Sequence, residues 1–221
     1  MKLWDAINGK DVLALDGKQD GVLSVAFSSD SRLLATAEND GTIRLWDATN
    51  GTLVRTLKRD AGNVKYAVTS VAFSPDGKHL ASVSGVRREK NLGKKVPFDT
   101  SIERKPLGPP LGKELLQNSI GELTLWDADN GKEIWSRKAH TGTIHCVTFN
   151  HDGKRLATAS GDKTVKLWDT AVGQEVLTLW GHTAGVTSVA FSTDGVRLAS
   201  ASRDSIVIWD ASKSMKSAQA K

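Results

Sequence analysis

Two sets of polar side chains in the second half of the sequence have the types that nucleophilic hydrolases use. In such enzymes a hydroxyl attacks the substrate, a histidine accepts its proton and a carboxylate orients the histidine. A catalytic triad occurs once, with one exposed hydroxyl and a dedicated base, whereas this set occurs twice, each time followed by a tryptophan. We therefore expect a structural role rather than catalysis. The two sets are His140, Thr158, Asp162 and Trp168, and His182, Ser200, Asp204 and Trp209.

Metal and phosphate chemistry have no better support in the residues. The five histidines fall in unrelated positions, and the single Cys146 excludes an internal disulfide framework and a multi-cysteine zinc site. The segment GPPLGKE at 108–114 has three residues between its glycines and a glutamate after its lysine, so it does not match a phosphate-binding loop. We expect no bound metal or cofactor.

A repeat organises these residues along the chain. Trp-Asp pairs recur with their tryptophans 42, 80, 42 and 41 residues apart, and a period near 40 indicates a repeat architecture. One segment with an anchoring phenylalanine precedes each of the last four pairs, so the 80-residue step holds a single enlarged unit. The pairs begin at Trp4, Trp46, Trp126, Trp168 and Trp209, and the anchors are Phe27, Phe73, Phe149 and Phe191.

Turn residues divide each unit into four short strands, which we call a to d, with alternating apolar and polar positions. Before strand d stands a glycine that can supply positive φ in the c–d turn. A four-stranded meander of about 40 residues cannot bury both its faces alone, so neighbouring units must stack around an axis. The sequence predicts an all-β protein, a β-propeller of four-stranded antiparallel blades. The glycines are Gly9, Gly51, Gly131 and Gly173.

These repeats resemble the WD-repeat family, including the bacterial-type tandem repeats attached to signalling domains in long chains. The resemblance implies a propeller domain over 1–210 and a polar tail at 211–221. Its four units are expected at about 22–57, 68–137, 143–180 and 185–210, the last one closed by residues 11–15. The family usually builds more blades, most often seven, and four units of that shape do not close a circle. We therefore expect a partial propeller, or half of a composite ring completed by self-association.

In the family, a histidine before strand a, a hydroxyl in strand b, an aspartate in the b–c turn and the tryptophan of strand c form a hydrogen-bonded tetrad. The resemblance assigns this structural role to both sets above, although the fourth unit has one residue fewer between its aspartate and its tryptophan. The first and second units match only in part, so we expect them to be more loosely ordered. The partial tetrads are Thr36, Asp40 and Trp46, with Lys18 in place of histidine, and Ser82 with Trp126.

Residues 86–119 interrupt the second unit with eight basic and four acidic side chains and four of the five prolines. They lack sustained periodicity, which predicts a surface loop. In a meander the b–c and d–a loops share one end, so this insertion and the extension near 63–66 project together. The insertion is either a tolerated solvated loop or a recruitment arm. Candidate partner-binding residues at this end are Arg87, Arg88, Lys94, Lys95, Lys65, Asn39 and Arg203.

We therefore expect a non-catalytic protein–protein interaction scaffold with an acidic protein partner and, more narrowly, a signalling or regulatory module. Nucleic-acid binding through the basic insertion is an alternative that we disfavour, because Phe98 is its only aromatic platform. A propeller enzyme is a third alternative.

Trp135 and Trp180 are expected to pack at blade edges. No apolar stretch has the length of a membrane span or a signal peptide, so we expect a cytoplasmic protein without membrane contact.

Overall fold

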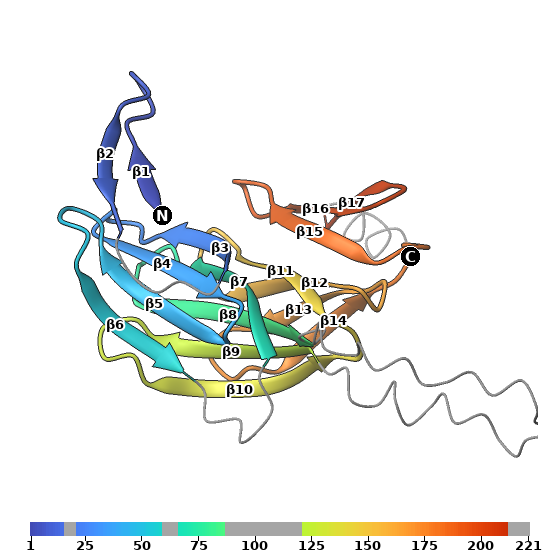
Figure 1. The fold of residues 1–221 in the computed structure, drawn as a ribbon. Helices are drawn as coiled ribbons and strands as arrows, with labels where there is room; N and C mark the ends of the chain where they lie inside the picture. The colour runs from blue at the N-terminus through green and yellow to red at the C-terminus, as the bar shows by residue number, and fades with distance from the viewer. Residues whose placement is uncertain (16–20, 59–65, 87–120, 212–221) are drawn as a thin grey trace, which may run out of the picture.

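The computed structural model describes residues 1–15, 21–58, 66–86 and 121–211. This part of the chain consists of strands and turns, and no helix occurs in it. Figure 1 shows the strands gathered into antiparallel sheets that follow one another along an open arc. The prediction of an all-β protein built from antiparallel blades is confirmed.

Three of the sheets contain four strands, each pairing with the next in chain order. The first contains β3 (Val22–Phe27), β4 (Leu33–Glu38), β5 (Thr42–Asp47) and β6 (Leu53–Lys58). The second contains β7 (Tyr66–Phe73), β8 (His79–Val86), β9 (Gly121–Asp127) and β10 (Glu133–His140). The third contains β11 (Ile144–Phe149), β12 (Arg155–Ser160), β13 (Val165–Asp169) and β14 (Glu175–Leu179).

The two ends of the arc differ from this pattern. The fourth sheet has three strands within the described residues, and the N-terminal segment forms a separate hairpin. We expected residues 11–15 to close the fourth sheet, and this expectation is wrong for the single chain. Residues 11–14 pair instead with residues 2–4, which are the nearer partner because a short turn joins these two strands. The strands are β15 (Val186–Phe191), β16 (Arg197–Ser202) and β17 (Ile206–Asp210), and β1 (Lys2–Trp4) with β2 (Asp11–Ala14).

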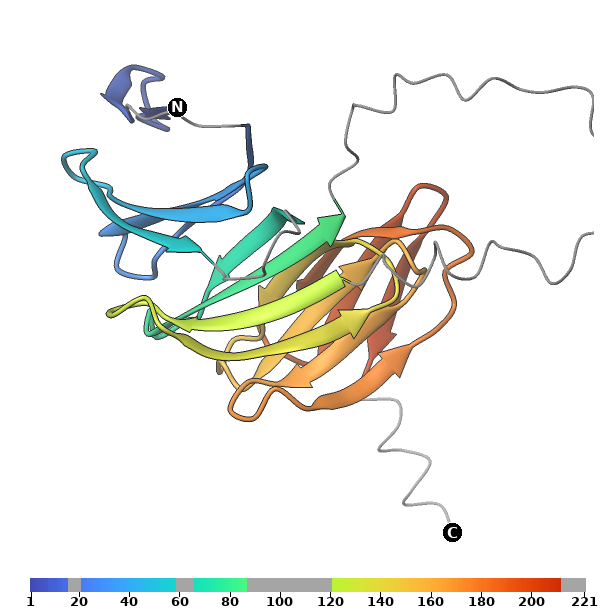
Figure 2. The ribbon, with the colours of Figure 1, turned by 60° about the horizontal axis from the view of Figure 1, so that its bottom comes forward.

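The core lies between neighbouring sheets rather than within one of them. The a strands β3, β7, β11 and β15 are adjacent along the inner side of the arc, and β7, β11 and β15 each also contact the b strand of the preceding sheet. Figure 2 shows the sheets stacked face to face from β3–β6 to β15–β17. Apolar side chains from two successive sheets therefore share each buried cluster.

The c–d turns follow one local rule. An aspartate after the tryptophan accepts a backbone hydrogen bond two residues later, as when Asp169 Oδ1 accepts from the Ala171 N–H at 3.0 Å. The glycine of this turn has a φ of 64° at Gly173 and 76° at Gly51, in the left-handed region that favours glycine. At Gly173 a Cβ atom would also lie 2.7 Å from the Trp135 ring. The turn thus connects strand geometry to packing against the preceding blade.

Candidate functional site

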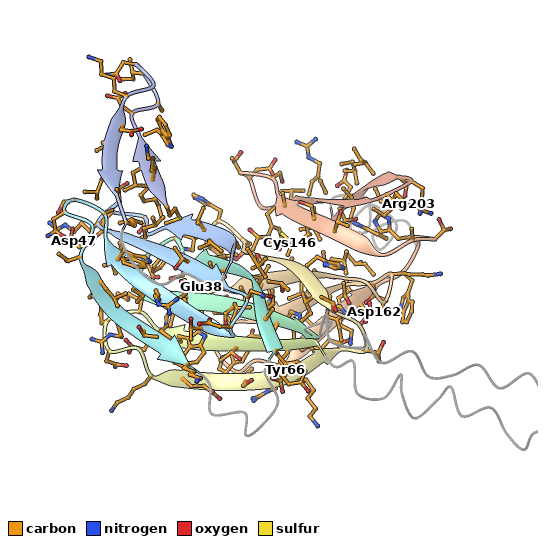
Figure 3. All side chains as sticks on the ribbon, in the orientation of Figure 1. Glu38, Asp47, Tyr66, Cys146, Asp162 and Arg203 are labelled. Atoms are coloured by element: carbon orange, nitrogen blue, oxygen red, sulfur yellow. The ribbon has the colours of Figure 1, made fainter. Side chains whose placement is uncertain are left out.

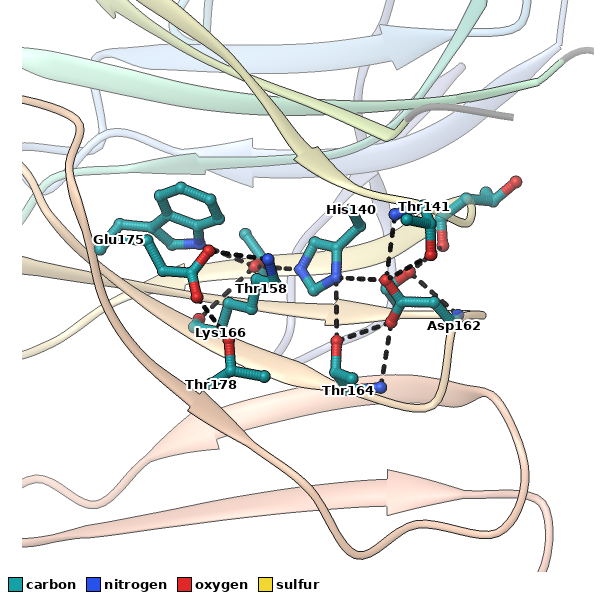
Figure 4. A network of polar contacts seen from close by, with 11 residues as sticks. His140, Thr141, Thr158, Asp162, Thr164, Lys166, Glu175 and Thr178 are labelled. Carbon is teal, nitrogen blue, oxygen red and sulfur yellow. Dashed lines mark hydrogen bonds and ion pairs between the residues drawn. The ribbon is translucent and has the colours of Figure 1, made fainter. Parts of the chain in front are cut away.

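The third unit brings its four predicted residues together in one buried network (Figure 4). His140 Nε2 lies 2.7 Å from Thr158 Oγ1, and the Trp168 indole N–H donates to the same hydroxyl oxygen at 2.9 Å. On the other side of the imidazole, Nδ1 lies 2.9 Å from Asp162 Oδ2. Two strands and one turn position this network. β10 ends at His140, β12 carries Thr158, and Asp162 lies in the turn before β13.

Thr164 is a fifth member that the sequence comparison did not indicate. Its hydroxyl donates to Asp162 Oδ1 at 2.6 Å and lies 3.1 Å from His140 Nδ1. Burial raises the pKa of Asp162, but hydrogen bonds from His140 and Thr164 outweigh it and hold that pKa far below its usual value. Asp162 is therefore an acceptor for several donors at neutral pH, which fixes the turn against the end of β10.

The burial of this network determines what chemistry it can do. Thr158, Trp168 and His140 are all buried. A hydroxyl that attacks a substrate must be reachable, whereas the Thr158 oxygen is already engaged by an imidazole and an indole N–H. The arrangement satisfies buried polar groups and does not present a nucleophile.

The fourth unit forms only part of the predicted tetrad. His182 Nε2 lies 2.7 Å from Ser200 Oγ, and the Trp209 indole N–H donates to that oxygen at 2.8 Å. Asp204 does not complete the set, contrary to the expectation. Its carboxylate accepts hydrogen bonds from Ser202 and Thr183, at 2.6 and 2.7 Å.

The missing residue in the b–c turn of the fourth unit explains this difference. With one residue fewer before Trp209, the Asp204 side chain lies over the end of strand b instead of over the imidazole. His182 Nδ1 has Ser205 Oγ at 3.3 Å in the place of a carboxylate. This hydroxyl is a weaker partner than an ionised aspartate, because hydrogen bonds to charged groups are about twice as strong.

The first unit replaces the histidine by an ion pair that the sequence comparison did not indicate. The Trp46 indole N–H donates to Thr36 Oγ1 at 3.1 Å, and that hydroxyl donates to Glu38 Oε1 at 3.2 Å. Glu38 is fully buried and pairs with the Arg44 guanidinium, which also lies 3.7 Å from Asp40. The tryptophan and the threonine are as buried as their counterparts in the third unit, so the first unit packs its partial tetrad without a histidine.

The signal for this ion pair was present in the repeat alignment. Glu38 stands two residues after the strand b hydroxyl, and Arg44 stands two residues before the tryptophan. Opposite charges occupy these two positions in the first unit alone. The same positions are Ser84 and Thr124 in the second unit, Ser160 and Lys166 in the third, and Ser202 and Val207 in the fourth.

In the described part of the second unit, the network consists of a single hydrogen bond between the tryptophan and the strand b hydroxyl. The Trp126 indole N–H donates to Ser82 Oγ at 2.8 Å. The hydroxyl of Ser84 is buried without a hydrogen-bond partner. A buried polar group without a partner is a cost to stability, so this blade lacks the support that Glu38 gives the first one.

The predicted partner-binding residues fall mostly outside the described ranges. Arg203 is exposed in the b–c turn of the fourth unit, and Asn39 is half-exposed in that of the first. Figure 3 shows Arg203 and Asp162 on one side of the molecule and Asp47 on the opposite side. The others, with Lys18 and nearly all of the insertion and the tail, lie outside the described residues. They are Lys65, Arg87, Arg88, Lys94 and Lys95.

Among the described residues, the b–c and d–a loop end carries exposed cations and one exposed aromatic ring. Lys163 and Arg203 are exposed there, while Asp162 and Asp204 are already hydrogen-bond acceptors within the chain. Trp180, in the d–a loop, is 73% exposed, so the expectation that it packs at a blade edge is wrong. Trp135 does pack there, because it is buried and donates to the Thr170 carbonyl at 2.9 Å.

The opposite end has a shallow hollow where the four a strands finish. The four anchor phenylalanines line it together with polar residues of the a–b turns. The lining includes Phe27, Phe73, Phe149, Phe191, Ser74 and Asn150.

No group of three or more metal-ligating side chains occurs in the described part of the chain. That part also holds no helix long and apolar enough to cross a membrane.

Comparison with known proteins agrees with this geometry. The model of the family described as "WD domain, G-beta repeat" matches residues 9–47, 51–85, 131–169 and 173–210, which together make up more than half of the chain. This chain belongs to the WD-repeat family. Each matched segment begins near strand d of one unit, and three of the four end with the Trp-Asp pair of the next, while the second ends at Gly85 in β8. A WD repeat and a structural blade are therefore offset by one strand.

Several curated proteins share these WD repeats. Serine-threonine kinase receptor-associated protein of Gallus gallus is 31% identical over 69% of this chain and 43% of its own length. Eukaryotic translation initiation factor 3 subunit I of Drosophila willistoni is 26% identical over 74% of this chain and 56% of its length. Target of rapamycin complex subunit LST8 of Saccharomyces cerevisiae is 29% identical over 75% and 59%. The chain thus spans about half the length of these relatives.

Proposed function

We propose that this WD-repeat chain is a non-catalytic protein-interaction scaffold that docks its partner at the b–c and d–a loop end. Two of the relatives are named as subunits of larger factors or complexes, and one as receptor-associated. The polar residues that resemble a hydrolytic triad are buried and committed to one another. A signalling or regulatory role is the narrower form of this proposal.

The single observation that carries the choice of surface is the exposure of two basic side chains at this loop end. Lys163 and Arg203 are exposed, whereas the neighbouring aspartates accept hydrogen bonds from within the chain. A basic surface attracts acidic partners, and this attraction is screened over roughly 8 to 10 Å at physiological salt. We therefore propose an acidic protein partner, to which the basic residues at 87–95 would add.

Charge reversal tests the surface. Lys163→Glu with Arg203→Glu should abolish most of the capture of partners from extracts of the source cells, measured by quantitative mass spectrometry. The matched control is Lys132→Glu with Lys154→Glu, which changes the net charge equally but at the a–b and c–d end. Equal loss with both double variants would contradict docking at the b–c end. Retention of every partner by the first double variant would also contradict it.

Nucleic-acid binding is the second candidate, and the exposure of Trp180 favours it. Proteins that bind single strands combine a cationic groove with aromatic platforms, and Trp180 and Arg203 lie at the same loop end. A single-stranded oligonucleotide should then quench the fluorescence of wild-type protein more than that of Trp180→Ala. Absence of salt-sensitive binding would remove this candidate and leave the protein partner.

A further inference from the structure

The outward face of the fourth sheet exposes two isoleucines whose counterparts are buried or partly buried in the other blades. The residue three before the tryptophan is buried in the first three units, but Ile206 is 75% exposed. The residue one before it is buried in the first two units, and Ile208 is 58% exposed. The buried counterparts are Ile43, Leu123 and Val165, and Leu45 and Leu125.

The outward face of the first sheet shows the reciprocal pattern on strand a. Val25 is 53% exposed, although the valine at this position is buried in each of the other three units. The anchor Phe27 is also 53% exposed, whereas Phe149 is buried. These side chains face away from the second sheet, toward the place that a preceding blade would fill. The buried valines are Val71, Val147 and Val189.

These two faces are the two halves of the contact that the molecule already makes three times. In one buried cluster, Leu123 and Leu125 of β9 pack with Val147 and Phe149 of β11. The same four positions meet between the first and second sheets, and again between the third and fourth. Ile206 and Ile208 therefore form the kind of apolar surface that covers the positions of Val25 and Phe27 in the other units. Val25 and Phe27 in turn form the kind of surface that covers the positions of Ile206 and Ile208.

The N-terminal hairpin occupies only the outer half of the space next to the first sheet. Leu15 shares a buried cluster with Leu34 and Trp46, so β1 and β2 lie where strands c and d of a preceding blade would lie. Strands a and b of that blade are not supplied by the hairpin, which leaves Val25 and Phe27 open. The inner half of the space therefore fits the a and b strands of another blade.

The hairpin also has the register of a c–d pair. Leu3 of β1 pairs with Leu13 of β2, just as Leu167 pairs with Leu177 in the third unit. Strand β17 has the same Trp-Asp ending as β1 and has no strand d beside it within the described residues. β17 can therefore pair with a β2 strand in the register that β1 now uses.

We propose that two copies of this chain associate head to tail through these end faces. The face with Ile206 and Ile208 of one copy packs on the face with Val25 and Phe27 of the other, and β17 replaces β1 beside β2. The fourth sheet thereby gains its strand d. Because each copy carries both faces, two copies satisfy both contacts at once and close a ring of eight sheets. This surface is separate from the loop end proposed above.

A charge placed on either face tests the association. Wild-type protein should sediment at about twice the 23.8 kDa of one chain. Ile206→Asp alone or Val25→Asp alone should weaken dimerisation about 100-fold or more, because each buries an unpaired charge. A mixture of the two variants should restore a dimer, since one of its two contacts joins two intact faces. A monomeric wild-type protein, or a mixture that stays monomeric, would overturn the proposal.

The matched control lies at a position that is exposed in all units regardless of neighbours. Val176 is 52% exposed, and its counterparts in the other units are exposed as well, so Val176→Asp should leave the dimer intact. Equal dissociation by Val176→Asp would show that the charge acts without regard to the end faces and would overturn the assignment. The counterparts are Val12, Val54 and Ile134.

A cross-link between copies tests the strand replacement directly. In a Cys146→Ala background, Leu13→Cys in one copy and Ile208→Cys in the other place two thiols opposite each other once β17 replaces β1. Oxidation of the mixture should give a covalent dimer on a non-reducing gel. The same mixture with Val176→Cys in place of Ile208→Cys should stay uncross-linked. Absence of the first cross-link, or equal yields in both mixtures, would overturn the replacement.

Discussion

The first and third units place the same buried pair in two different chemical settings. In each, a tryptophan indole donates to a threonine hydroxyl, from Trp46 to Thr36 and from Trp168 to Thr158. The third unit continues through an imidazole to Asp162, whereas the first continues through the carboxylate of Glu38 to a guanidinium. The buried indole and hydroxyl thus require a partner, but they do not require a histidine.

The two networks should differ in how much stability is lost when one member is removed. The imidazole can exist as a neutral group, so the third unit can lose its aspartate without leaving a full charge buried. Glu38 is fully buried and Arg44 is mostly so, and removing one member strands the other in a poorly solvated place. The ion pair of the first unit should therefore be the more damaging of the two to break.

The largest effect is expected for Arg44→Ala. Loss of the guanidinium leaves the Glu38 carboxylate buried without its cation, which should cost about 3 to 5 kcal/mol in the free energy of unfolding. Denaturant titration measures it. Arg155→Ala breaks a half-exposed pair with Asp169 and should cost less than about 1 kcal/mol. A similar cost for both variants would contradict the special status of the buried pair.

A double variant sharpens this result. Glu38→Ser with Arg44→Thr installs the residues that the second unit has at these positions, Ser84 and Thr124. It removes both charges, so it should recover a large part of the stability that Arg44→Ala loses. Greater instability of the double variant would mean that the pair itself, rather than the stranded charge, supports the blade.

Asp162→Ala should have the next largest effect. It leaves His140 and Thr164 without their shared acceptor, at a cost of about 1 to 3 kcal/mol. Thermal or denaturant unfolding measures the change. Unfolding equal to that of wild-type protein would show that the network contributes nothing to the stability of the third unit.

The contribution of Asp162 should also depend on pH. Its pKa is lower in the folded protein than in the unfolded chain, so the folded state is favoured by the ionised form. This stabilisation is fully present well above the unfolded pKa of about 4 and is lost as the pH falls below it. The stability difference between wild-type protein and Asp162→Asn should therefore shrink in melts at pH 3 relative to pH 7. A difference that grows on acidification would contradict this account.

The smallest effect is expected for Asp204→Ala, the matched position of the neighbouring blade. Asp204 is exposed, and its carboxylate accepts side-chain hydrogen bonds from Ser202 and Thr183. It makes no hydrogen bond to His182 among the described contacts. Its melting temperature should stay close to that of wild-type protein and well above that of Asp162→Ala. An equal drop for both variants would mean that the fourth unit has the complete tetrad after all.

The fold and the third network follow closely from the sequence because their causes are local. The 42-residue steps, the alternating strands and the turn glycines set four meanders without reference to anything distant. Likewise, the Asp-to-Trp spacing of six residues in the third unit and five in the fourth already indicates a disturbed turn at Asp204. The resemblance to known WD repeats then assigns His140, Thr158, Asp162 and Trp168 to one site.

Only the tertiary structure decided the features that depend on which neighbour is present. Glu38 and Arg44 meet because β4 and β5 pair so that their side chains turn inward together. Val25 and Val147 share one repeat position, yet one is exposed and the other buried, because a sheet covers only the second. A repeat specifies the same surface each time, and the stacking order determines which copies of it are covered. That order is long-range information, which no single repeat contains.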